Sequence, residues 1–339
     1  MLLRLNPSIE PESKGLLAMI TKVLSWVIAI GFVSSTALIS GSEVASAEPT
    51  CSSEMQVTLD DLGDFPATCS ALGATVQLPN DLQITIPAAG YSTSMFVLLA
   101  DSPGVEATVY RNADGSIGAD FNGESYGSPA LQSEQLVTSS LVAPLVANSS
   151  TCTYLTTNTT GYKWASTHNW RYNSTFEVNA ASLTTIRSGL NTWRSGTNQC
   201  TSASYTSSFP SGYLGTTSLV PAGGASGCNT PDGVNVVGWR PLASTTLGIT
   251  CLSALGSSIV EADVSFTTSV AWFSSTSTAG CSQQYDLASV ATHEFGHLLG
   301  LGHAPVGTGQ TMIPTYSTCQ LAYRNLGASD LAGVKKIYP

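Results

Sequence analysis

The chain has 339 residues, of which 42% are hydrophobic and 10% are charged, and its formal net charge is -10. This composition favours compact folding over disorder. Acidic residues outnumber Lys and Arg by 22 to 12, which argues against a basic surface for binding nucleic acid.

The N-terminal segment has the features of an export signal. Lys14 and Lys22 come before an apolar run over residues 23–39, and Ala45-Ser46-Ala47 then provides an A-x-A-like cleavage sequence. We therefore expect residues 1–47 to be a signal peptide, and the mature protein to be secreted without stable membrane association. An uncleaved membrane anchor is the alternative, because the apolar run is nearly as long as the shortest spanning helices.

Charge divides the rest of the chain into two parts. Residues 48–150 contain twelve acidic residues and one basic residue, whereas residues 151–339 contain seven acidic and eight basic residues. Short β-prone runs separated by Pro, Asn, Asp and Gly predict a small acidic β-rich domain over residues 48–127. Clusters of Ser, Thr and Asn predict a linker over residues 128–160, which leaves residues 161–339 as a second domain.

The second domain combines predicted helices and strands. Apolar residues at three- and four-residue steps behind Asn179 predict a helix over residues 180–193. Asp286 is a suitable N-cap for a second helix that ends near Leu299, and a third helix is expected after Ser329. The expected strands are residues 234–239 and 259–266. This alternation indicates a mixed α/β fold.

Eight cysteines follow the predicted signal peptide, and an even number in an exported chain favours disulfide bonds. No two of them form a C-x-x-C pair, so a cysteine-bound structural zinc has little support. The sequence does not determine how these residues pair: Cys51, Cys69, Cys152, Cys200, Cys228, Cys251, Cys281 and Cys319.

Residues 293–303 contain the side chains that point most clearly to a chemical function. On a helix, His293 and His297 lie on one face a turn apart, so both imidazoles can bind one ion. Gly300 suits a left-handed turn after the helix, through which His303 returns as a third ligand. Three imidazoles suit a tetrahedral Zn²⁺ whose fourth position is open, which is the arrangement of a catalytic zinc site.

Glu294 follows the first ligand by one position, about 100° round the helix. Its carboxylate can reach a zinc-activated water without becoming a ligand, which makes it the expected general base. Chance does not explain the pattern, because the chain contains only four histidines. The fourth, His168, is expected to be a surface or core residue rather than a ligand.

With these residues the sequence resembles the metzincin zinc metallopeptidases, and in particular the matrixin-like branch with its matrix metalloproteinase-type catalytic domain. The family pattern H-E-x-x-H-x-x-G-x-x-H is present in full, and the segment from Thr311 to Tyr316 is similar to the Met-turn of matrixins. The resemblance covers roughly residues 160–339. It implies that Met312 lies beneath the metal, and that Pro314 and Tyr316 form part of a substrate pocket. It also implies an α/β (α+β) zinc peptidase domain with a twisted, mostly parallel sheet and an active-site helix.

The sequence departs from animal matrixins in several respects. Too few histidines remain for a second, structural zinc, so one catalytic Zn²⁺ is expected. Asp232-Gly233-Val234-Asn235 offers ligands for a structural Ca²⁺, although an Asp-Gly pair is more often a simple turn. No P-R-C-G-type propeptide motif occurs upstream. Cys51 or Cys69 has the chemistry to bind zinc in its place, but a disulfide between the two is the simpler interpretation.

The sequence therefore predicts a secreted zinc-dependent endopeptidase that hydrolyses internal bonds of protein or peptide substrates through a zinc-activated water. The acidic region before residue 150 is interpreted as an inhibitory propeptide of a zymogen, with a folding aid or a substrate-binding domain as alternatives. From another functional class, the alternative is an exported zinc-binding adhesion or recognition module with negligible turnover. Oligomeric state and side-chain preference do not follow from the sequence.

Overall fold

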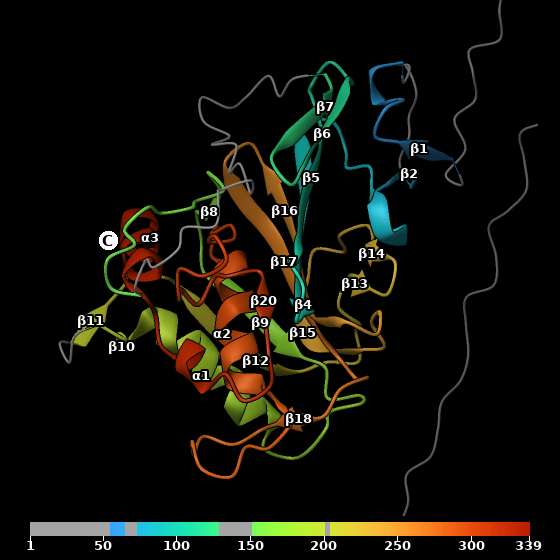
Figure 1. Cartoon of the computed structure of the whole chain (residues 1–339). Coiled ribbons are helices and arrows are strands. Elements are labelled where there is room, and N and C mark those ends of the chain that lie inside the picture. The colour runs from blue at the N-terminus through green and yellow to red at the C-terminus, as the bar shows by residue number, and fades with distance from the viewer. Residues whose placement is uncertain (1–54, 65–72, 129–150, 201–203) are drawn as a thin grey trace, which may run out of the picture. The chain divides into compact units, whose positions relative to one another are not determined.

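The computed structural model describes residues 55–64, 73–128, 151–200 and 204–339 (Figure 1). The predicted signal peptide, Cys51, Cys69 and residues 129–150 of the predicted linker lie outside the described residues. Glu48–Pro339 forms one compact unit. In the described part of the chain, no helix is long and apolar enough to cross a membrane.

Among the described residues, three α-helices form close to the predicted ranges, although the N-cap of the first is Ala181 and not the predicted Asn179. They are α1 (Ser182–Arg194), α2 (Leu287–Leu298) and α3 (Ala328–Ile337). The carboxylate of Asp286 caps α2 by accepting a hydrogen bond from the backbone N–H of Ser289 at 3.0 Å. Short 3-10 turns are η1 (Leu62–Asp64), η2 (Pro79–Asp81) and η3 (Leu321–Arg324).

The remaining regular structure consists of strands. Those before residue 200 are β1 (Gln56–Thr58), β2 (Thr75–Gln77), β3 (Gln83–Thr85), β4 (Tyr91–Ala100), β5 (Val105–Arg111), β6 (Ile117–Phe121), β7 (Glu124–Gly127), β8 (Lys163–Trp164), β9 (His168–Tyr172) and β10 (Ser195–Thr197). Those after it are β11 (Ser204–Thr206), β12 (Ser211–Thr216), β13 (Gly223–Gly224), β14 (Gly227–Cys228), β15 (Asn235–Arg240), β16 (Thr246–Leu255), β17 (Ser258–Thr267), β18 (Trp272–Phe273), β19 (Tyr285–Asp286) and β20 (Thr315–Tyr316). The predicted strands at 234–239 and 259–266 correspond to β15 and β17.

Most of these strands belong to one mixed sheet, in the order β12-β9-β15-β17-β16-β4-β5-β6-β7, with β8 paired to β17 and β20 paired to β4. Neighbours from β12 to β17 are parallel, whereas neighbours from β17 through β16 and β4 to β7 are antiparallel. The mostly parallel sheet was predicted for residues 161–339, and the described strands of that part agree with it, because β16 is the one strand of the large sheet there that runs antiparallel to its neighbour. The antiparallel strands follow from loop length, because loops of two to five residues join β4 to β5, β5 to β6, β6 to β7 and β16 to β17, and a parallel crossover needs many more.

Strands of the acidic N-terminal region pair with strands that follow residue 200. β4 pairs with β16 in the large sheet, and β3 pairs with β14 in a second sheet of order β1-β2-β3-β14-β13. The β-rich content predicted for residues 48–127 is present in its described part. The division into separate domains at residues 127 and 160 stays a prediction.

Two hydrophobic cores share strand β4. The first core lies against α1 and α2, and the second lies against β1, β2 and β3. Side chains of a strand alternate between its faces, so Phe96 and Leu98 enter the first core while Met95 and Val97 enter the second. Residues from both halves of the chain thus depend on this strand for their packing.

Disulfide bonds tie the loops to this framework. Among the described residues they are Cys152–Cys200, Cys228–Cys251 and Cys281–Cys319. The Cys228–Cys251 bond joins β14 to β16, and the Cys281–Cys319 bond joins the loop before α2 to the loop after β20. Three such bonds agree with the disulfides predicted from the cysteine count.

His168 is a core residue, one of the two places the sequence allowed for it. Its side chain is fully buried in β9, with its ring centroid 4.8 Å from that of Trp164, and its Nε2 has no hydrogen-bond partner among the described residues. Burial lowers the pKa of His168 to about 3. The unfolded chain therefore binds a proton here at a higher pH than the folded chain does.

We predict that His168 contributes to acid sensitivity. Its stabilising contribution is complete above the unfolded pKa of about 6.5 and is lost as the pH falls toward the folded value. Between pH 7 and pH 5 the loss is about 2 kcal/mol of unfolding free energy. Urea unfolding of the wild type and of His168→Gln at both pH values should show a shallower pH dependence in the variant. Equal slopes would contradict this assignment.

Candidate metal centre

Three histidines converge at the C-terminal end of α2. His293 and His297 lie one turn apart on the helix, and their Nε2 atoms are 2.9 Å apart. Gly300 follows with a φ of +102°, a conformation that residues with a side chain rarely adopt. This turn brings back His303, whose Nε2 lies 3.1 Å from that of His297. The structure thus brings together the three ligands predicted from the sequence.

Backbone carbonyls fix the tautomers of the first two histidines. Nδ1 of His293 donates to the carbonyl of Thr311, and Nδ1 of His297 donates to the carbonyl of Leu301, each at 2.8 Å. A neutral ring that donates from Nδ1 carries a lone pair on Nε2. Burial lowers the pKa of His293 to about 4, and burial together with the neighbouring histidines holds the pKa values of His297 and His303 well below the usual range.

This donor set fits a zinc ion. Lone pairs that face one another at about 3 Å repel unless a cation lies among them, and neutral imidazoles backed by backbone carbonyls are typical zinc ligands. In the described part of the chain, these histidines are the one group of three or more His, Cys, Asp or Glu whose ligand atoms all lie within 4.8 Å of one another. His293, His297 and His303 are therefore the candidate metal ligands in the described part of the chain.

The calcium alternative gains no support from the structure. Asp232 accepts a hydrogen bond from the N–H of Val234, and Gly233 has a φ of +83°. The side-chain oxygen of Asn235 accepts from the N–H of Ala262. This segment therefore has the hydrogen bonds of a turn, which was the alternative interpretation.

Glu294 points from α2 toward strand β16. Oγ1 of Thr250 donates to its Oε2 at 2.6 Å, while Oε1 has no hydrogen-bond partner among the described residues. Burial raises the pKa of Glu294 to about 8, and the Thr250 hydrogen bond opposes that shift. A Cβ at position 248 would lie 2.3 Å from Oε1, so the carboxylate fits only because residue 248 is glycine.

Met312 packs directly beneath the helix that carries the first two ligands. A Cβ at position 296 would lie 2.2 Å from the sulfur of Met312, so Gly296 permits this close approach. The carboxylate of Asp330 accepts hydrogen bonds from the N–H groups of Thr311 and Met312 at 2.6 and 3.3 Å. α3 thus fixes the backbone on which Met312 lies.

Tyr316 lies beside the histidines, and Pro314 precedes it by two residues. The ring of Tyr316 is buried 5.5 Å from that of His293, and its hydroxyl donates to the carbonyl of Thr311 at 2.6 Å. The carbonyl of Pro314 accepts from the N–H of Gly104 at 2.9 Å. The backbone of both residues therefore contacts the acidic N-terminal region, Pro314 through Gly104 and Tyr316 through β4.

Two residues of that region contact the histidines, and sequence reasoning did not find them. Phe96 stacks on His297 with the ring centroids 4.2 Å apart, and Glu106 accepts a hydrogen bond from the N–H of His303 at 3.1 Å. The apolar run at residues 95–99 is a recognisable signal for a buried strand. Nothing in that run identifies its partner, so its place over the metal centre was not predictable.

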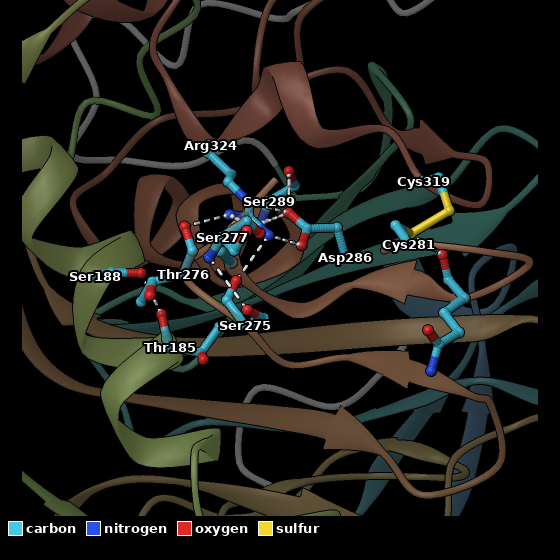
Figure 2. A network of polar contacts seen from close by, with 12 residues as sticks. Thr185, Ser188, Ser275, Thr276, Ser277, Cys281, Asp286, Ser289, Cys319 and Arg324 are labelled. Atoms are coloured by element: carbon cyan, nitrogen blue, oxygen red, sulfur yellow. Dashed lines mark hydrogen bonds and ion pairs between the residues drawn. A yellow bond between two sulfur atoms is a disulfide. The ribbon is translucent and has the colours of Figure 1, made fainter. Parts of the chain in front are cut away.

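A polar network fixes the start of α2 (Figure 2). Arg324 on η3 donates to both carboxylate oxygens of Asp286, from Nε at 2.8 Å and from Nη2 at 2.5 Å. It also donates to the carbonyls of residues 275–277. Asp286 in turn accepts from the N–H and the hydroxyl of Ser289. One guanidinium thereby joins the loop before the helix to the helix cap.

The fold and the site define a protein with a helix-borne metal centre of three histidines and an adjacent glutamate, set against a mixed sheet. Residues 246–339 match the Matrixin family model, and this segment runs from β16 to α3 and contains all of these residues. The chain is matrixin-like over this segment.

Two matrilysins are similar in sequence to this chain over a shorter stretch. The chain is 48% identical to matrilysin of Mus musculus over 48 residues and 47% identical to matrilysin of Rattus norvegicus over 49 residues. Each match covers 14% of this chain and 18% of the relative, so the chain spans less than a fifth of the length of these relatives.

We predict that Arg324→Met destabilises the fold and weakens zinc binding, because it leaves the buried carboxylate of Asp286 without its cation. Loss of one partner of a buried ion pair costs about 3 kcal/mol. Urea unfolding and zinc competition with a chelator should both show the loss. Adding Asp286→Asn should recover part of it, because the amide is neutral and still caps the helix. Exposed Arg194→Met is the matched control, and an equal effect there would contradict the prediction.

Proposed function

We propose that this protein is a secreted zinc-dependent endopeptidase that hydrolyses internal bonds of protein or peptide substrates. The observation that carries the proposal is the convergence of three Nε2 lone pairs in a matrixin-like segment, next to a glutamate with one free carboxylate oxygen. A structural zinc site needs no such glutamate, because its ligands complete the coordination.

His293, His297 and His303 are the residues that would hold the ion. A bound zinc lowers the pKa of water and polarises the carbonyl of a peptide bond. The hydrogen bonds to the carbonyls of Thr311 and Leu301 orient two of the rings and make their Nε2 atoms better donors to a metal. Met312 supports the helix beneath them.

Glu294 is the proposed general base. Thr250 holds Oε2, so the carboxylate cannot rotate freely and Oε1 stays available to accept a proton from the attacking water. When the carbon–nitrogen bond of the substrate breaks, Glu294 passes that proton to the leaving amine. Gly248 supports this role because it leaves space for the carboxylate.

Pro314 and Tyr316 are proposed to line the substrate pocket once the N-terminal region no longer covers them. The three disulfides among the described residues support export, since such bonds persist in oxidising compartments. We further propose that residues 1–47 are a cleaved signal peptide and that the acidic region after them is the propeptide of a zymogen.

We predict that Glu294→Gln lowers peptide hydrolysis by about 10² to 10⁴ without loss of zinc, because it removes the base and leaves the ligands intact. Quenched-fluorescent peptides should be tested with residues 48–339, before and after limited proteolysis, and metal content should be measured in parallel. Chelation should abolish activity, and added zinc should restore it. Glu177→Gln is the control, because Glu177 is exposed and lies far from residues 293–303 in the sequence.

Two results would contradict the proposal. Equal activity of Glu294→Gln and wild type would remove Glu294 from the mechanism. Stoichiometric zinc binding without cleavage by any form of the protein would instead favour the zinc-binding adhesion or recognition module.

We also predict that Gly248→Ala lowers activity while zinc affinity stays unchanged. The three atoms nearest to the new methyl group all belong to Glu294, so the change displaces that carboxylate. Misplacement of a catalytic group by about 1 Å costs about 100-fold in rate. Thr250→Val, which removes only a hydrogen bond, should have a smaller effect. The measurement is kcat of both variants. A lower kcat for Thr250→Val than for Gly248→Ala would contradict this prediction.

A further inference from the structure

The edge of β16 next to the metal centre is covered by the chain itself. Tyr91–Ala100, which is β4, pairs antiparallel with β16 from Leu99 opposite Thr246 to Tyr91 opposite Leu255. On its other side, at the C-terminal end of the strand, β4 pairs parallel with β20, where Leu99 lies opposite Thr315. The C-terminal end of β4 therefore lies between β16 and β20, and β5 pairs with the rest of that side of β4.

β16 is also the strand that carries the environment of Glu294. Thr250 holds Oε2 of Glu294, and Gly248 leaves room for Oε1. A peptide whose scissile bond is to reach Glu294 has to lie beside this strand. Extended peptides bind to a sheet by adding a strand to a free edge, with main-chain hydrogen bonds to that edge. In the structure, β4 pairs with that edge from Thr246 to Leu255, with one irregularity between Thr246 and Gly248.

Strand β4 and the first residues of β5 also cover the three histidines. Phe96 on β4 stacks on His297 at 4.2 Å with an interplanar angle of 10°, and Glu106 on β5 accepts from the N–H of His303. As a result His293, Glu294 and His297 are 0% exposed and His303 is 1% exposed. A site for a polypeptide substrate cannot work while it is closed to this extent.

We propose that β4 and the start of β5, residues 91–106, form an autoinhibitory strand that occupies the position of an extended peptide substrate. The inhibitor is a strand and an aromatic ring rather than a cysteine. This inference rests on the proposed function, because it names the regulation of the same site. Release requires that the strand leave both β16 and β20, so severing the chain after β7 converts an intramolecular contact into one that dilution can dissociate.

The test uses the full chain from residue 48 with a cleavage site for a highly specific protease inserted directly after Ser128. While the chain is uncut, the strand acts at an effective concentration on the order of millimolar, so specific activity should be low and independent of protein concentration. After the cut, specific activity should rise on dilution. In parallel, the chromogenic chelator pyridylazoresorcinol reports the rate of zinc removal, which should rise with the same concentration dependence.

Phe96→Ala should raise the concentration at which half of the cut protein is active by on the order of 100-fold, because it removes a fully buried ring from the interface. Phe121→Ala on β6 is the matched control. It makes the same substitution in the same region at a partly buried ring with no contact to the histidines, so we expect a shift of less than about tenfold.

The readouts separate this inference from the proposed function. If the uncut chain cleaves peptides as fast as the cut and diluted chain, the autoinhibitory strand is wrong and the endopeptidase stands. If cutting and dilution expose zinc to the chelator without any peptide cleavage, the strand is upheld and the endopeptidase is wrong. If neither zinc removal nor activity changes, even with Phe96→Ala, β4 is a permanent part of the domain and the inference is overturned.

Discussion

The structure around the metal centre depends on one constraint, which is that three neutral imidazoles must present their Nε2 atoms to the same point. Lone pairs at this separation repel one another, so packing and hydrogen bonds have to hold the rings in place before an ion does. Much of that support comes from residues that follow α2. The carbonyl of Thr311 orients His293, Asp330 holds the backbone at Thr311 and Met312, and Arg324 holds the helix cap at Asp286. The last part of the chain therefore acts chiefly as a support for one helix.

Close contact on two sides fixes the position of that helix. At Gly248 the carboxylate of Glu294 meets β16, and at Gly296 the sulfur of Met312 meets the helix, with no room for a Cβ at either place. Every residue of α2 is buried, which is the expected state of a helix enclosed between a sheet, another helix and a loop. A site built on such rigid elements is held more closely than a site on loops alone. The two glycines thus determine geometry although neither has a side chain.

What the sequence predicted correctly was local. The spacing of His293 and His297, the cap at Asp286 and the turn at Gly300 act within a few residues, so a single stretch of sequence contains the whole signal. The antiparallel strands β4 to β7 did not follow from the family resemblance, because they lie before residue 160, where that resemblance begins. The contacts of Phe96 and Glu106 were also missed. They join residues about 200 positions apart in sequence, and such pairings depend on complementary surfaces and not on any spacing within one segment.

β4 has two physical roles that oppose each other. As a strand it completes the sheet, contributes to both cores and covers the edge of β16, and an uncovered edge strand is a template for association with other chains. As an occupant of the substrate position it keeps the site closed. A strand weak enough to leave readily would expose that edge before any substrate was present. Tethering resolves the conflict, because a covalent link keeps even a moderately bound strand in place, and one cut removes that advantage without altering a single contact.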